Sequence, residues 1–152
     1  NSLYYTVYSS LLVALIIIFP GSIFPEIINI FGFILALLIS IFLSYSIYYI
    51  MICCAFWFGE VRSIVVAYNL TMLVLSGQYI PIRLFPESII EFLEITPFIY
   101  LVDFPVSIAT GRMPTDMWLI NFIFSIGWCI IMWMIGILVY NRGIKNYEAY
   151  GS

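Results

Sequence analysis

The sequence contains little charge and no histidine. Only 9% of its 152 residues are charged, with five basic residues against eight acidic ones. A soluble domain carries roughly 25% charged residues, so this composition is that of a chain whose surface does not face water. Without histidine, neither a Ser–His–Asp triad nor an H-E-x-x-H zinc site exists within it. Five basic residues are too few for a nucleic-acid footprint, and we expect no nucleic-acid partner.

Cysteine is scarce and carries no ligand pattern. Cys53, Cys54 and Cys129 lie inside apolar runs and form no C-x-x-C pair. We interpret them as small apolar side chains and not as metal ligands or a disulfide framework. The sequence also lacks G-x-x-x-x-G-K-[ST], the loop that cradles the phosphates of ATP. We therefore expect no cofactor and no metal in this chain.

Hydrophobic sequence is abundant. The chain is 64% hydrophobic and 19% aromatic, and its mean hydropathy is +1.14. A transmembrane helix needs about 20 consecutive apolar residues. Four segments fit, at about residues 3–19, 30–57, 63–80 and 117–140. The sequence predicts an all-α integral membrane protein with about four transmembrane helices, forming a single transmembrane domain over residues 1–152.

The second predicted span carries a stripe of small side chains. The run from Ile27 to Phe58 contains no charged residue. Within it a small residue recurs every fourth position, at Gly32, Ala36, Ser40 and Ser44. Such a stripe lets two helices approach closely. Packing within the chain is the favoured interpretation, and a seam between two copies is the alternative.

The segment between the third and fourth spans is too apolar for an ordinary loop and too broken for a span. It is interrupted by Pro81, Pro86, Pro97 and Pro105. Pro86 suits the first position of a helix, and Thr96-Pro97 closes that helix and starts another. We expect Asp103 and Pro105 to interrupt the second helix, and Gly111 to cap it. The pattern predicts two short re-entrant or interfacial helices over about 86–111, which dip into the membrane without crossing it.

Acidic residues in this segment do not form a recognisable catalytic site. Glu87, Glu91 and Glu94 share one helix face, but no nucleophile or metal-binding pattern accompanies them. A solvated acidic face is the favoured interpretation, so we predict no catalytic residue and no enzyme, and an intramembrane lipid enzyme is the least favoured hypothesis. Asp103 is the best candidate for a functional buried acid. An exposed interfacial position is an equal alternative for it.

The basic residues indicate an orientation. Four spans place both termini on one side, together with Arg62, Arg142 and Lys145, while Arg83 and Arg112 fall on the other. The positive-inside rule therefore favours a cytoplasmic C-terminus. The chain begins at Asn1 without Met and without a signal-peptide pattern. We expect it to be a fragment that lacks preceding spans.

The order of several short motifs resembles a known family. A span ending in Ser76-Gly77 is followed by Phe85-Pro86, Thr96-Pro97-Phe98, Phe104-Pro105 and Gly111. A Phe-Trp-Phe-Gly-Glu stretch precedes them at 56–60, and a Tyr-Glu-Ala-Tyr-Gly tail follows at 147–151. Together, over about residues 55–151, these motifs resemble the C-terminal half of type-2 ATP-binding-cassette (ABC) permeases of the bacterial branch. The first 50 residues match only as hydrophobic spans.

The resemblance implies a transport role. This chain would be spans three to six of a permease subunit in an ATP-driven exporter of the bacterial plasma membrane. It would work with a second permease half, the same or a related chain, and with two ABC ATPase subunits that hold ATP and Mg²⁺, all in contact with membrane lipid. The first two spans and the coupling helix between them would be missing.

The resemblance also assigns residues. The outer gate, in the re-entrant segment, would be shaped by Gly77, Pro81, Phe85, Pro86, Pro97, Phe98, Asp103, Pro105 and Gly111. The turn that contacts the ATPase would be formed by Phe58, Gly59, Glu60 and Arg62. A structural or assembly subunit of a larger membrane complex, without transport activity, is the alternative. The small-residue stripe suits that alternative, but re-entrant helices serve no evident purpose in a scaffold.

Overall fold

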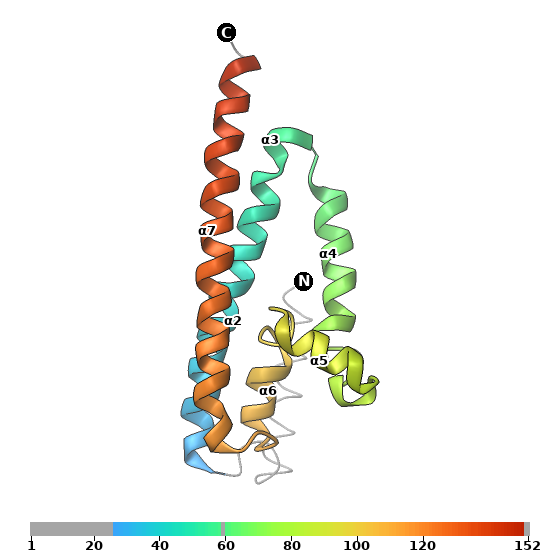
Figure 1. The fold of residues 1–152 in the computed structure, drawn as a ribbon, viewed down its shortest axis with the longest axis vertical. Coiled ribbons are helices and arrows are strands. Elements are labelled where there is room, and N and C mark those ends of the chain that lie inside the picture. The colour runs from blue at the N-terminus through green and yellow to red at the C-terminus, as the bar shows by residue number, and fades with distance from the viewer. Residues whose placement is uncertain (1–25, 59, 151–152) are drawn as a thin grey trace, which may run out of the picture.

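The computed structural model describes residues 26–58 and 60–150, and their regular elements are all helices (Figure 1). In chain order they are α2 (Ile27–Cys53), α3 (Ala55–Phe58), α4 (Arg62–Leu75), η1 (Ile82–Leu84), α5 (Glu87–Ile95), α6 (Asp103–Ala109), η2 (Thr115–Met117) and α7 (Trp118–Tyr150). The span predicted at residues 3–19 lies outside the described residues.

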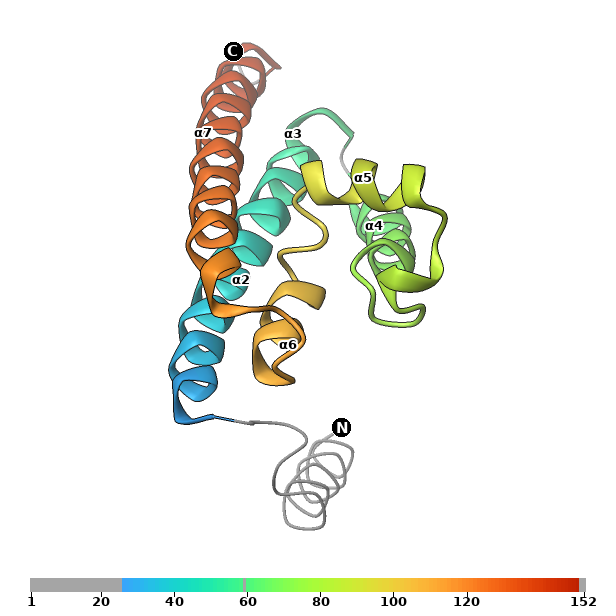
Figure 2. The same ribbon diagram turned by 60° about the horizontal axis from the view of Figure 1, so that its bottom comes forward.

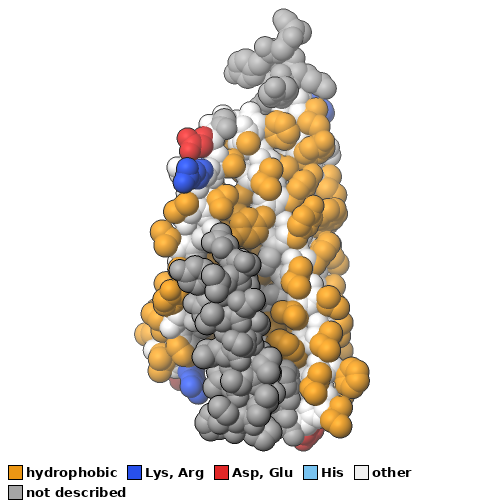
Figure 3. Space-filling view, turned by 180° about the vertical axis from the view of Figure 1, so that it is seen from behind, with side chains coloured by type: hydrophobic (Ala, Val, Ile, Leu, Met, Phe, Trp, Pro, Cys, Tyr) orange, Lys and Arg blue, Asp and Glu red, His pale blue; other side chains and the backbone are white. Residues whose placement is uncertain are grey.

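Two helical stretches are long and apolar enough to cross a membrane, Ile27–Phe58 and Thr115–Lys145. They contain α2 and most of α7. These two helices lie side by side and run in the same direction, while α4 runs back the opposite way (Figures 1 and 2). Figure 3 shows hydrophobic side chains along the height of the described face, with charged ones near its two ends. This distribution suits a chain whose sides face lipid and whose ends reach water.

The third predicted span is shorter than its 63–80 prediction. α4 has 14 residues, ends at Leu75 and is capped by Ser76. Gly77 follows with a φ of 80°, and its N–H and that of Tyr79 donate back to the last turn. Glycine adopts this left-handed conformation without steric cost, which is why the helix stops here. At about 1.5 Å per residue α4 is about 21 Å long, shorter than a hydrocarbon core of about 30 Å.

The small-residue stripe of α2 packs within the chain. Ala36 is fully buried, Gly32 and Ser40 are buried, and Ser44 is half-buried. A Cβ added at Gly32 would lie 2.5 Å from the Trp118 ring of α7. The missing side chains therefore allow α6 and α7 to approach α2 closely.

α7 is longer than its 117–140 prediction. The helix continues through Gly143 to Tyr150. Gly143 therefore does not cap the helix; its lack of a side chain leaves room for the ring of Phe56. Gly136 similarly lies against Tyr49, whose ring packs on Trp133 with centroids 5.8 Å apart. This aromatic seam places the turn around α3 at the same end of the molecule as the last turns of α7 (Figure 1).

We predict that Gly32→Val destabilises the fold by about 1–3 kcal/mol, the usual cost of overpacking a close helix contact. Gly127→Val is the matched control, since a Cβ at Gly127 meets nothing within 4 Å and both glycines are inside helices. Thermal unfolding in detergent, followed by far-UV circular dichroism, measures the difference. Equal melting temperatures for the two variants would contradict this packing.

Candidate functional site

The first α-helix in the segment between α4 and α7 is α5, which follows η1. Pro86 is its N-cap, one residue before the first helical position predicted for it, and accepts hydrogen bonds from the N–H groups of Ile89 and Ile90. The helix ends at Thr96, whose N–H and hydroxyl both donate to the carbonyl of Leu93. Thr96 therefore terminates α5 with its own side chain.

The second short helix starts later than predicted. Residues 97–102 form turns, and Asp103 begins α6 instead of interrupting it. Pro105 is the third residue of α6, where its missing N–H does no harm because the first N–H groups of a helix have no partner within it. Gly111, with a φ of 64°, follows the cap residue Thr110.

The end of α6 is closed by two characteristic hydrogen bonds. The N–H of Arg112 donates to Ser107 O at 2.9 Å, and that of Gly111 donates to Ile108 O at 3.1 Å. This pair is the Schellman motif, which requires a left-handed residue at the position that Gly111 occupies. The glycine therefore directs the chain away from α6 and toward the start of α7.

Two buried side chains of α2 hold the re-entrant backbone. Asn29 Nδ2 donates to Ile108 O at 2.7 Å, and Ser40 Oγ donates to Leu101 O at 2.5 Å. Both side chains come from residues that are 5% exposed. The two residues are eleven positions apart on α2, about 16 Å along the helix axis. The segment between α4 and α7 therefore follows α2 along this length, and its non-helical carbonyl at Leu101 has a protein donor.

Asp103 is partly buried and paired. Its Oδ1 lies 3.4 Å from Arg112 Nη2, and its Oδ2 accepts a hydrogen bond from Ser107 Oγ at 3.2 Å. The Asp103 side chain is 18% exposed and that of Arg112 is 36% exposed. The pair connects the start of α6 to the turn that follows its end.

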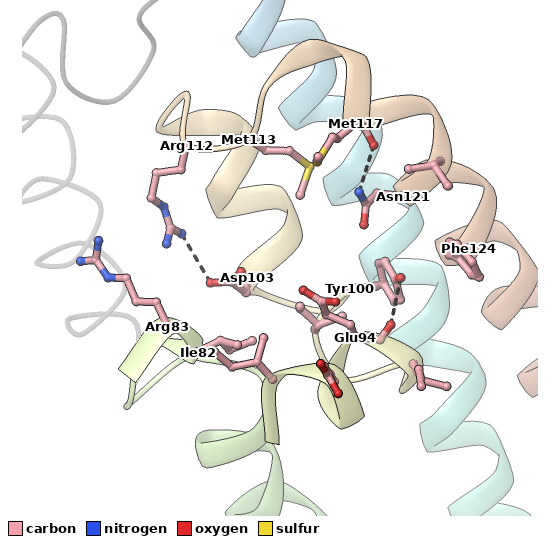
Figure 4. Close-up of a pocket in the computed structure, with 15 residues that line it drawn as sticks. Ile82, Arg83, Glu94, Tyr100, Asp103, Arg112, Met113, Met117, Asn121 and Phe124 are labelled. Carbon is pink, nitrogen blue, oxygen red and sulfur yellow. Dashed lines mark hydrogen bonds and ion pairs between the residues drawn. The ribbon is translucent and has the colours of Figure 1, made fainter. Parts of the chain in front are cut away.

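A cavity of about 810 Å³ opens beside this ion pair (Figure 4). Its charged lining consists of Arg83, Glu91, Glu94, Asp103 and Arg112. A second cavity of about 450 Å³ shares Arg83, Asp103 and Arg112 with the first. The larger volume lies within the range of about 300–1,000 Å³ that is usual for ligand sites.

Tyr100 forms part of the cavity wall and connects it to the helical core. Its hydroxyl donates to the backbone carbonyl of Glu94 at 3.2 Å. Burial, and secondarily the negative charge of Glu94, raises the pKa of Tyr100, so the phenol remains a neutral donor at physiological pH. Its ring packs edge-on against Phe104, and Phe104 packs against Phe122 of α7.

The residues assigned to the outer gate all belong to this segment. Gly77, Pro81 and Asp103 come together at the smaller cavity, and a Cβ at Gly77 would lie 3.4 Å from the Cβ of Asp103. The others occupy joints between elements. Phe85 and Pro86 separate η1 from α5, Pro97 and Phe98 follow α5, and Pro105 and Gly111 lie at the two ends of α6.

The residues assigned to the ATPase-contact turn lie at the opposite end of the molecule. Phe58 is 69% exposed, Glu60 and Arg62 are also exposed, and Gly59 lies outside the described residues. Arg62 starts α4. The helix dipole disfavours a cation at a helix N-terminus, so the charge of Arg62 does not stabilise α4.

The sequence analysis did not predict the hydrogen bond of Asn29 or the position of Arg83 and Arg112 beside the cavities. Asn29 is the single side-chain amide in the uncharged run 27–58, and a lone polar group in a membrane span is a recognisable signal. Arg83 and Arg112 were predicted only as markers of orientation, whereas the fold brings both to the cavities.

The comparison with protein families settles the class. A model of the ABC-2 family transporter proteins matches residues 4–151. This chain belongs to the ABC-2 transporter family. No curated protein and no solved structure matches it. Membership agrees with the resemblance to type-2 ABC permeases and makes the protein a membrane transport component.

We predict that Ser40→Ala loosens the re-entrant segment of this ABC-2 protein. The substitution leaves the buried carbonyl of Leu101 without its donor, at a cost of about 1–3 kcal/mol. Amide hydrogen exchange of a peptide covering residues 97–109, followed by mass spectrometry, should become about tenfold faster or more. Ser44→Ala, one helical turn away on α2, is the control and should leave exchange unchanged. The anchoring role of Ser40 would be refuted if neither variant exchanged faster than the wild type, or if both exchanged faster by the same factor.

Proposed function

We propose that the chain is the membrane permease subunit of an ATP-driven exporter, working with a second permease half and two ATPase subunits. The observation that carries the proposal is the family match over residues 4–151. The sequence has no phosphate-binding loop, so ATP and Mg²⁺ would be held by the partner ATPase. The permease would then contribute the translocation path and two alternative packings of its helices, and it would catalyse no reaction.

The re-entrant segment is proposed as the outer gate. α4 ends about 21 Å from its start, and the chain then turns through η1, α5 and α6 before α7 begins. The gate is attached to α2 by the hydrogen bonds of Asn29 and Ser40. ATP binding would close the ATPase pair and shift the permease between inward-facing and outward-facing populations, and movement of α2 would be transmitted to the gate through these bonds.

The turn of Phe58, Glu60 and Arg62 is proposed as a contact with the ATPase. It lies at the same end as the last turns of α7 (Figure 1), where Arg142 and Lys145 are exposed. Three basic residues at this end favour the cytoplasmic side of a bacterial plasma membrane. Both features support the proposal that an ATPase subunit docks at this turn.

The test is purification of the tagged permease in mild detergent, with mass spectrometry of the bound proteins and an ATPase assay. We expect an ABC ATPase in near-equal amount. The double substitution Glu60→Ala, Arg62→Ala should lower its recovery and the ATPase activity by about tenfold or more, since hydrogen bonds to charged groups contribute about 1.5–3 kcal/mol each. Asp116→Ala, an exposed charge at the other end of the molecule, is the control.

Two results would contradict the proposal. An intact membrane complex without any ATPase would refute the transporter assignment and favour the scaffold alternative. An ATPase that is recovered equally with the double variant and with Asp116→Ala would refute the contact turn, while leaving the permease assignment in place.

A further inference from the structure

The larger cavity contains charges that the proposed gate does not use. Among residues 26–58 and 60–150, Asp103 and Arg112 form an ion pair, and neither Arg83 nor Glu91 nor Glu94 has an ion-pair partner. These three side chains nevertheless line the same cavity, two acids from α5 and one base from η1. Charged groups at membrane depth are found where they face a partner or a hydrated cavity.

The charged side chains lie on two sides of the cavity, with one exception: Asp103 lies between Arg83 and Arg112 in Figure 4 and is paired with Arg112. In Figure 4, Arg83 and Arg112 approach the cavity from the same side, and Glu94 lies toward its middle beside Tyr100. Two guanidinium groups offer planar donors that match the oxygens of a phosphate. The carboxylates of Glu91 and Glu94 accept hydrogen bonds from an ammonium group. The cavity therefore presents an anion-binding side and a cation-binding side to one ligand.

The rest of the lining is apolar and continues onto the outside of α7. Met117, Ile120 and Phe124 line the cavity, and all three are more than half exposed. In Figure 4 Phe124 lies on the side of the cavity opposite Arg83. Long apolar chains that leave the cavity past these side chains would remain in contact with hydrophobic surface.

We propose that this cavity binds a zwitterionic phospholipid, with its phosphate at Arg83 and Arg112, its ammonium at Glu91 and Glu94, and its acyl chains along α7. The inference rests on the membrane location shared with the proposed function but not on ATP-driven transport. Its test uses no ATPase and no ATP, so failure of one leaves the other standing.

The test is native mass spectrometry of the purified full permease in detergent, titrated separately with dioleoyl-phosphatidylethanolamine and dioleoyl-phosphatidylglycerol. The two lipids have the same chains and phosphate, and only the first carries an ammonium. We expect the first to bind about tenfold more tightly, the ratio that corresponds to one additional charged hydrogen bond. The double variant Glu91→Gln, Glu94→Gln should lose this preference, and Arg83→Ala should weaken the binding of both lipids.

The matched control is Glu87→Gln, an exposed acid of the same helix that does not line the cavity, and it should retain the preference. Circular dichroism and gel filtration of each variant establish that it is folded. The proposal is overturned if the wild-type permease shows no preference for the ethanolamine lipid. It is equally overturned if Glu87→Gln removes the preference, or if the folded double variant keeps it.

Discussion

Two side-chain hydrogen bonds from α2 fix the segment between α4 and α7 against the long helices. Asn29 and Ser40 satisfy the carbonyls of Ile108 and Leu101, about 16 Å apart along the helix axis. A backbone that is not helical tolerates membrane depth only when its polar groups are paired or hydrated. The glycine and serine stripe of α2 makes this possible, because it brings the re-entrant chain within hydrogen-bonding distance.

α4 stops at Leu75, and the chain then passes through η1, α5 and α6 before α7 begins. The larger cavity is lined in part by charged side chains, and charged groups at membrane depth are found where they face a partner or a hydrated cavity. Both cavities thus lie among the short elements that follow α4.

The sequence predicts most of the helices in this arrangement, but not where α4 ends or which side chains pair. The long apolar runs predict α2 and α7, and the proline spacing predicts two short helices between α4 and α7. The early end of α4 was missed because Gly77 lies within an otherwise apolar stretch, and its left-handed conformation depends on the turn that follows. The pairing of Asp103 with Arg112 was missed because the Schellman turn at Gly111 brings residues nine positions apart together, which no periodicity reveals.

The most direct test asks whether the re-entrant segment surrounds a hydrated space inside the membrane. Nitroxide labels at Glu94→Cys, on the cavity, and at Ile123→Cys, on the exposed face of α7, are compared in lipid nanodiscs after Cys53, Cys54 and Cys129 are replaced. Collisions with a water-soluble nickel chelate and with oxygen are measured by electron paramagnetic resonance. The account predicts that the label at 94 favours the chelate and the label at 123 favours oxygen. Oxygen-dominated collisions at both positions would contradict it.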